Sequence, residues 1–334
     1  MIKMDMETIS AKGPEQEGES SENTAWGILT KLSQSETWEE HLGKINHLNK
    51  EKGRSDSIER LKEMDIESLS DEEKDFIKNL AMETIRDRYE NDYTRDSIAK
   101  LPEVIHFSAA EDFAKDVNET LRYQSESISF SEDAITGGIY LADYRTKSGK
   151  PEIYLSTTKN EACRNAEDLL CNMVHESLHY LSNKVLDTQM IDTPYSQYRR
   201  HDIVEEGITE MLAQDTMEDL GVTQTRRGYN DYVSFARELS DCVGRDTITN
   251  AYLPSDGSRF GIYAIQEKFD NLFTEEENKK CMNSSTFWTL YANQEYVTLM
   301  NQGVFRTDEK TLEQSKRNIN AIFAKAKTRA NSGD

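Results

Sequence analysis

The sequence contains few cysteines, fewer basic than acidic residues and no long apolar run. Its four cysteines are sparse for 334 residues and form no Cys-x-x-Cys pair, so we expect reduced, mostly buried thiols instead of a disulfide framework. No stretch approaches the roughly 18 consecutive apolar residues of a membrane span. The first 27 residues also lack the basic-then-apolar pattern of a cleaved signal peptide. We therefore expect a protein without a membrane span that is cytoplasmic in its producer, or exported by a specialised secretion system.

Negative charge dominates the composition. The chain has 62 Asp and Glu against 40 Lys and Arg, which gives a net charge of −22. Such a protein repels phosphate backbones, so general nucleic-acid binding is disfavoured. Hydrophobic residues make up only 36% of the chain, so part of it should lie outside the core. Residues 1–25, which are polar and acidic, are the part predicted to form a disordered tail.

Residues 26–100 predict a helical N-terminal region. Apolar periodicity favours helices over Thr37–Asn49 and Asp71–Tyr89. Ser70 and Glu73 predict a capping box at the start of the second helix. Two arrangements are open for this region, which can fold independently or brace the domain after it.

Residues 101–305 predict the main domain, and residues 306–334 a charged C-terminal helix or tail. Three strand-like runs come first, at Ile105–Phe107, 137–142 and 151–156, and the turn-forming residues between the last two predict a β-hairpin. An apolar stripe then predicts a helix that ends near Ser182. The later helices are expected at Asp202–Met217, Tyr229–Val243, Arg259–Phe273 and Thr286–Met300. The predicted fold class is a helix-dominated α+β fold with a small sheet ahead of the central helix.

His175, Glu176 and His179 form the pattern His-Glu-x-x-His inside the predicted central helix. Residues four apart share one helix face, so both imidazoles can bind one metal ion. Glu176 can then accept a proton from the water on that ion. Two imidazoles and a carboxylate suit zinc, with a fourth position left for water. The alternative is two surface histidines on an ordinary helix, a pattern that chance produces in about one such chain in a hundred.

A third ligand is expected further along the chain, because catalytic zinc sites normally have three protein ligands. Asp202 and Glu205 predict a capping box, so a second helix should begin there. Glu206 and Glu210 share one face of this helix, and the small Gly207 is expected to allow close packing against the first helix.

This combination resembles the gluzincin branch of zinc metallopeptidases, the thermolysin-like group. More narrowly, Glu205–Leu212 is similar to the Glu-Gly-Leu-Thr-Glu-x-Leu segment of bacterial zincin-like proteins, and residues 229–253 are similar to a later segment of those proteins. The resemblance covers about residues 150–265 and implies a zincin-like metallopeptidase domain. It implies one catalytic Zn²⁺ ion held by His175, His179 and Glu206. The metzincin extension is absent after His179, because residues 180–185 contain neither its glycine nor its third histidine.

Several supporting residues have alternative interpretations. Glu205 is expected to cap the second helix with Asp202, with a metal ligand as the alternative; it lies about 100° around the helix from Glu206, so the two cannot approach one metal in the same way. Glu210 is either a solvated residue or a partner for the free N–H of a ligand histidine. His201 is an alternative ligand, although it precedes the predicted helix. His41, His47 and His106 lack metal-ligand spacing and are taken as incidental.

Peptide hydrolysis also needs a donor to the oxyanion of the tetrahedral intermediate. Tyr198 is the candidate, since a tyrosine slightly upstream of the ligand glutamate serves in some related zincins. The competing donors are Tyr195, Tyr232 and His201. Ile153–Leu155 is expected to be an edge strand that pairs with an extended peptide, with an ordinary buried strand as the alternative.

These features predict a zinc metallopeptidase that acts on a protein or peptide substrate, with Glu176 as general base and proton shuttle. Endopeptidase action is favoured because no acidic motif for binding a terminal amine stands out. A bacterial secreted effector or toxin is one setting in which such an enzyme would act. The alternative from another class is a non-catalytic zincin-fold module with a structural zinc, against which the intact Glu176 argues.

Overall fold

The computed structural model describes residues 52–122, 137–142, 145–182, 203–222, 230–253, 261–301, 303 and 308–332. Residues Ser55–Asp334 form one compact unit, separate from Met1–Arg54. The predicted tail at 1–25 and the predicted helix Thr37–Asn49 lie outside the described residues.

A helix over residues 52–62 comes first. The elements after it are η1 (Ile66–Ser68), α3 (Asp71–Tyr89), α4 (Arg95–Val104), β1 (Ile105–Ser108), α5 (Ala110–Thr120), β2 (Gly138–Leu141), β3 (Glu152–Ser156), α6 (Ala166–Ser182), α7 (Ile203–Asp219), α8 (Asn230–Val243), α9 (Arg245–Tyr252), α10 (Gly261–Asp270), α11 (Glu275–Lys279), η6 (Met282–Ser284), α12 (Thr286–Asn301) and α13 (Glu309–Ser332).

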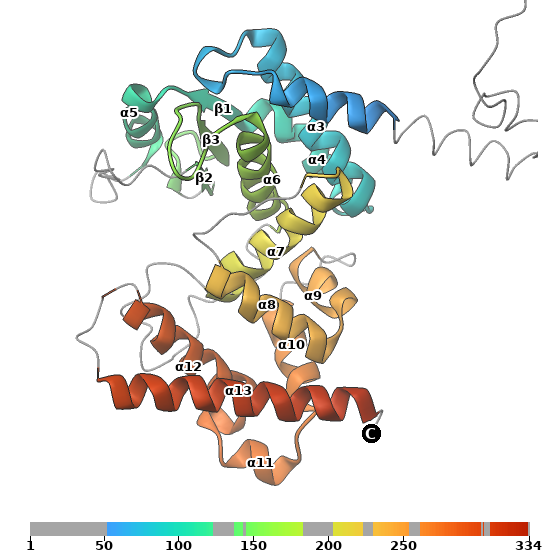
Figure 1. Cartoon of the computed structure of the whole chain (residues 1–334), viewed down its shortest axis with the longest axis vertical. Helices are drawn as coiled ribbons and strands as arrows, with labels where there is room; N and C mark the ends of the chain where they lie inside the picture. Colours follow the sequence, from blue (N-terminus) through green and yellow to red (C-terminus); the bar gives the residue numbers. More distant parts are fainter. Residues whose placement is uncertain are drawn as a thin grey trace, which may run out of the picture. The chain divides into compact units, whose positions relative to one another are not determined.

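The fold is helix-dominated α+β, as predicted, with the small sheet ahead of the central helix α6 (Figure 1). The predicted helices at α3, α7, α8, α10 and α12 are confirmed within a few residues at each end. Short helices α5, α9 and α11 were not predicted. All four cysteines are free thiols, and three of them are buried. Among the described residues, no helix is both long and apolar enough to cross a membrane.

Helix α3 carries the capping box that its sequence predicts. The Ser70 hydroxyl accepts the N–H of Glu73, and the Glu73 carboxylate accepts the N–H of Ser70. At its other end, the Tyr89 hydroxyl donates to the Leu212 carbonyl of α7. Arg88 of α3 forms an ion pair with Asp215 of α7. Helix α3 therefore packs against α7 inside the same compact unit.

The sheet has the strand order β1-β3-β2, with β1 parallel and β2 antiparallel to β3. This confirms the predicted hairpin and the short strand at Ile105–Phe107. The prediction that Ile153–Leu155 is an edge strand is wrong, because Ile153 pairs with Ile105 on one side and with Tyr140 on the other. Strand β1 adds to the hairpin from far upstream, a pairing that no local pattern reveals. In the three-stranded sheet, β3 is therefore central, and β1 and β2 lie on either side of it.

The two faces of the sheet are covered by different helices. Ile153 and Leu155 belong to the main core, which also contains the apolar stripe of α6. On the opposite face, Tyr154 and Leu141 pack with Phe113 of α5 in a second, smaller cluster. This alternation results from the two-residue period of a strand. On the face of the main core, β2 and β3 both contact α6, the helix that carries both histidines of the His-Glu-x-x-His pattern.

Helix α7 packs between α6 and α8, and Gly207 makes the second of these contacts possible. A Cβ atom at Gly207 would lie 2.5 Å from the carbonyl oxygen of Tyr232 and 3.4 Å from the Cβ of Ala236, both on α8. The prediction that Gly207 allows close packing against α6 is therefore wrong. Consecutive residues point about 100° apart around a helix, so Gly207 faces α8 when Glu206 faces α6.

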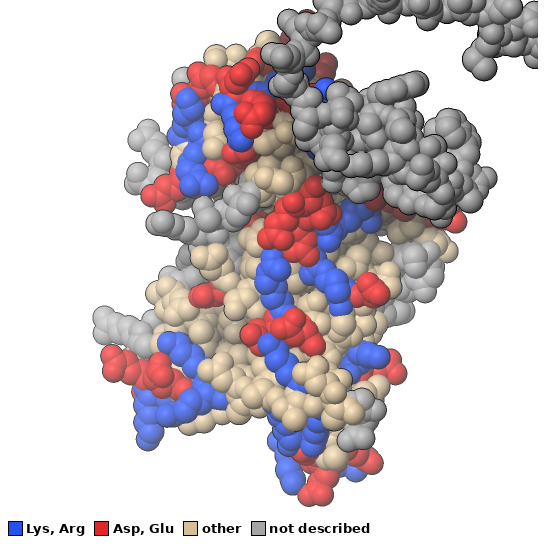
Figure 2. Space-filling view, turned by 45° about the vertical axis from the view of Figure 1, so that its right-hand side comes forward, with Lys and Arg blue, Asp and Glu red and all other residues tan. Residues whose placement is uncertain are grey.

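Charged side chains are mixed over the surface. On the face shown in Figure 2, basic and acidic side chains of the described residues alternate and form no broad basic area. Many of them are paired: Asp215 of α7 contacts Arg88 of α3, Arg237 of α8 and Arg245 of α9. This group ties three helices to the end of α7 that lies away from the histidines.

Candidate metal centre

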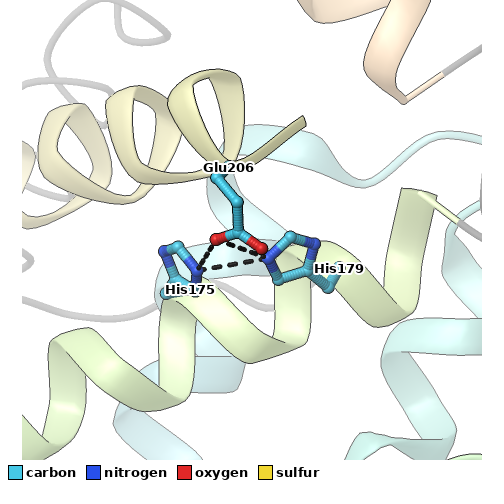
Figure 3. A group of neighbouring side chains, drawn as sticks. All are labelled: His175, His179 and Glu206. Atoms are coloured by element: carbon cyan, nitrogen blue, oxygen red, sulfur yellow. Dashed lines mark hydrogen bonds and ion pairs between the residues drawn. The ribbon is translucent and has the colours of Figure 1, made fainter. Parts of the chain in front are cut away.

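Helices α6 and α7 bring His175, His179 and Glu206 together, as predicted (Figure 3). The two histidines lie one turn apart on α6, and their Nε2 atoms face each other at 3.2 Å. Glu206 approaches from the first turn of α7 and places its Oε2 atom 3.4 Å from the Nε2 of His175 and 3.6 Å from that of His179. Three donor atoms from two helices thus converge on one point.

The spacing of these donors fits a tetrahedral metal ion. With zinc–ligand bonds of 2.0–2.1 Å, donors at tetrahedral angles lie about 3.3 Å apart. The three measured separations are 3.2, 3.4 and 3.6 Å. The two separations that involve Glu206 are longer than the usual N–H···O hydrogen bond. His175, His179 and Glu206 therefore have the chemistry and the spacing of a site for a metal ion such as zinc.

A buried carboxylate supports the first histidine. The Oε2 atom of Glu210 lies 2.8 Å from the Nδ1 of His175, and Glu210 is completely shielded from solvent. Its other oxygen accepts a hydrogen bond of 3.1 Å from Gln214. Because a carboxylate only accepts, the Nδ1 of His175 must carry the proton, which leaves Nε2 free to bind a metal.

The second histidine has a different set of neighbours. The Nδ1 atom of His179 lies 3.4 Å from the Oε1 of Glu205. The hydroxyls of Thr209 and Tyr252 each lie 3.5 Å from the same nitrogen. Glu205 therefore lies behind the ring, on the side away from the cluster, and is not among the three converging donors.

Burial and charge act in opposite directions on the three clustered side chains. Burial lowers the pKa of His175, but its hydrogen bonds to Glu206 and Glu210 outweigh burial and raise the pKa overall. The pKa of His179 rises well above its usual value, because Tyr252, Glu206 and Glu205 together outweigh burial. For Glu206, burial raises the pKa, but the two histidines outweigh it and hold the pKa well below the usual range. Metal binding at these histidines therefore competes with their protonation.

Glu176 stands on the same helix but outside the cluster. Its side chain is partly exposed and packs beside β2, where a Cβ atom at Gly138 would lie 3.0 Å from the Glu176 Cγ. The stem of the Glu176 side chain therefore lies next to β2.

Of the remaining candidates, the structure places only Tyr232 and His106. Tyr198, the predicted donor to the oxyanion, lies outside the described residues, as do Tyr195, His201 and Asp202. Tyr232 is a buried residue of α8. His106 lies on the sheet, where its Nε2 is 2.5 Å from the Oε2 of Glu152.

Sequence reasoning missed two neighbours of His179, Thr209 and Tyr252. Thr209 lies one turn after Glu205 on α7, so helix phase alone could have placed it near the same histidine. Tyr252 lies on α9, in the last stretch of the family resemblance, and nothing in its local pattern points to His179.

Comparison of the chain with protein-family models, with curated proteins and with solved structures finds no match in any of the three. The gluzincin resemblance stays a prediction that rests on the motif residues, and the function has to be argued from the site.

Proposed function

We propose that this protein is a zinc-dependent metallopeptidase, and an endopeptidase in particular. The observation that carries the proposal is the convergence of His175, His179 and Glu206 on one point, with Glu176 next to His175 on α6 but not among the three donors. A site built only to bind a metal has no need of an additional carboxylate at that place.

The three donors would hold the zinc ion and leave its fourth position open. Structural zinc sites are normally closed by four protein ligands, whereas catalytic sites have three. Among the described residues, the cluster contains three donors. When bound, zinc supplies Lewis acidity, which polarises a carbonyl group and makes a coordinated water acidic near neutral pH.

Glu176 serves as general base and then as proton shuttle. Its partly exposed carboxylate takes a proton from the attacking water and delivers it to the amide nitrogen as the peptide bond breaks. General acid–base catalysis of this kind contributes about 10²–10⁴-fold to a rate. The missing side chain at Gly138 leaves room for the Glu176 side chain beside β2.

The chemistry of the site supports a peptide as the substrate. A general base next to three converging metal donors suits the attack of water on an amide carbonyl. Strand β2 lies beside the Glu176 side chain, so the sheet forms one boundary of the place where a substrate would meet the base.

Metal-dependent cleavage by the purified protein tests the proposal. We expect cleavage of a peptide library, read by mass spectrometry, that a chelator stops and added zinc restores. Glu176→Gln should keep zinc and fold but lose cleavage by at least about a hundredfold, because it removes the base and leaves the three ligands. Glu167→Gln, on the first turn of the same helix, is the matched control and should cleave normally. Cleavage by Glu176→Gln at the wild-type rate, or no metal-dependent cleavage by the wild type, would overturn the proposal.

A further inference from the structure

Behind His179, two fully buried hydroxyls form a hydrogen-bonded pair. The Thr209 Oγ1 of α7 and the Tyr252 hydroxyl of α9 bond to each other, and each lies 3.5 Å from the Nδ1 of His179. Neither residue has any exposed surface. The hydroxyl of Ser182, at the end of α6, also neighbours the Tyr252 hydroxyl. Side chains from three helices therefore meet at the back of one imidazole ring.

The donors and acceptors around this nitrogen can be counted. The Thr209 hydroxyl donates its proton to the Glu205 carbonyl over 2.7 Å, and the Ser182 hydroxyl donates to the His179 carbonyl over 2.9 Å. Tyr252 can therefore only donate to these two hydroxyl oxygens, since neither has a proton to give it. The carboxylate of Glu205 is an acceptor too.

Every oxygen within 3.5 Å of the Nδ1 of His179 thus has a lone pair and no proton to offer it. The histidine must be the donor, so its proton sits on Nδ1 and the lone pair of Nε2 points into the metal cluster. The opposite tautomer would leave Nδ1 without a donor in a buried place, which costs free energy.

Tyr252 cannot itself supply the donor to the oxyanion. It lies on the Nδ1 side of the His179 ring, whereas the metal cluster lies on the Nε2 side. A hydroxyl with no exposed surface behind a ligand cannot contact a substrate in front of it. Its effect on the site must pass through His179.

We propose that Thr209 and Tyr252 are positioning residues for His179, holding its ring and its tautomer in the state that binds the metal. The inference rests on the metal site of the proposed function and deepens it. The two ligand histidines are then supported differently, His175 by the buried carboxylate of Glu210 and His179 by a buried hydroxyl pair beside the partly exposed carboxylate of Glu205. Helix α9, which contributes no metal ligand, becomes part of the metal site through Tyr252.

The chain contains a matched control for this pair. On the same helix α7, the Thr216 hydroxyl bonds to the hydroxyl of Tyr89 over 3.0 Å and donates to the Leu212 carbonyl over 2.6 Å. Both residues are buried, and Thr216, like Thr209, donates to the carbonyl four residues before it, while the Tyr89 hydroxyl also contacts the Leu212 carbonyl. The Tyr89–Thr216 pair differs in that it joins α7 to α3, and Thr216 lies two turns (about 10 Å) further along α7 than Thr209.

The experiment compares Tyr252→Phe and Thr209→Val with Tyr89→Phe and Thr216→Val in the full chain. Zn²⁺ affinity is measured by titration with a competing chelator, and the absorption spectrum of the Co²⁺-loaded protein reports the ligand geometry. We expect Tyr252→Phe and Thr209→Val to weaken Zn²⁺ binding by about 10–100-fold and to change the Co²⁺ spectrum, since changes behind a ligand histidine have that size. Thr209→Ser, which keeps the hydroxyl, should restore both readouts. The two control variants should lose comparable stability but bind Zn²⁺ like the wild type.

Equal Zn²⁺ affinities and equal Co²⁺ spectra in the two sets of variants would overturn the inference. So would a failure of Thr209→Ser to bind more tightly than Thr209→Val. Both readouts are independent of peptidase activity, so these outcomes leave the proposed function standing. A wild-type protein that binds no Zn²⁺ would instead overturn the metal site, and with it the proposed function and this inference.

Discussion

The carboxylate of Glu210 lies 2.8 Å from the Nδ1 of His175, and both side chains are buried. A carboxylate without exposure is costly unless its oxygens are hydrogen-bonded. The second oxygen of Glu210 accepts from Gln214. Of the two interpretations that the sequence leaves open for Glu210, the structure supports the partner of a ligand histidine. The solvated residue is excluded.

Replacing Glu210 should weaken metal binding without removing a ligand. In Glu210→Gln, the amide can present an N–H to His175 and so favour the tautomer whose Nε2 carries the proton. We expect Zn²⁺ affinity to fall by about 10–100-fold in a chelator titration. Glu218→Gln, an exposed position on the same helix, is the control. Unchanged affinity in Glu210→Gln would contradict the role assigned to this contact.

Replacing any of the three proposed ligands should reduce metal retention far more than replacing a neighbouring residue. His175→Ala, His179→Ala and Glu206→Ala each leave two donors, which bind zinc far more weakly, so we expect loss of the co-purifying metal. Glu205→Ala should keep the metal, because Glu205 faces the Nδ1 side of His179. His106→Ala, on the sheet, is the control for a histidine of no consequence to the site. Metal analysis of the purified variants gives the order, and retention by Glu206→Ala together with loss by Glu205→Ala would reject the ligand assignment.

Helical periodicity was sufficient to predict which candidate side chains share a face, while the choice of Glu206 came from the family resemblance, and the structure brings His175, His179 and Glu206 together. Helix α6 places His175 and His179 on one face because they are four residues apart, and Glu206 and Glu210 share a face of α7 for the same reason. Helical periodicity and a capping box likewise predicted α3 at its observed bounds. These are features whose physics involves only neighbouring residues.

Features that depend on distant parts of the chain were predicted incorrectly or not at all. The position of β3 in the sheet depends on β1, which precedes it by more than forty residues. The packing of Gly207 depends on which of two helices lies against that face of α7. Tyr252 reaches His179 from α9, and its own sequence environment is that of an ordinary core residue. Such contacts are fixed by the tertiary arrangement, which a period of 2 or 3.6 residues does not encode.

Gly138 should be required for the position of Glu176. In Gly138→Ala, the added Cβ would lie 3.0 Å from the Glu176 Cγ and 2.9 Å from the Leu155 Cδ2, so one of these side chains has to move. Displacing a catalytic group by about 1 Å can cost about a hundredfold in rate. We therefore expect Gly138→Ala to keep its metal while the rate of peptide cleavage falls by up to that amount. Gly53→Ala, where the added Cβ meets no atom within 4 Å, is the control. Full activity in Gly138→Ala would show that the strand does not confine the base.

Glu277 should stabilise the attachment of α13 in a pH-dependent manner. Its carboxylate accepts from the guanidinium of Arg329 over 2.8 and 3.1 Å and pairs with Lys325, both on α13. It also accepts the N–H of Thr274 in the capping box of α11. The hydrogen bond from Arg329, together with the weaker effect of Lys325, holds the pKa of Glu277 well below its usual value of 4.5.

A carboxyl group whose pKa is lowered by folding stabilises the folded state above its unfolded pKa, and this contribution is lost as the pH falls. Glu277→Gln should therefore lower the midpoint of thermal unfolding at pH 7, and the difference from the wild type should shrink as the pH drops below about 4.5. Hydrogen exchange should show faster opening of α13 in the variant. Glu276→Gln, which loses only an exposed pair with Lys280, is the control and should change little at either pH. If the effect of Glu277→Gln were as large at pH 3 as at pH 7, the stabilisation would come from packing or from the cap instead of from the charge.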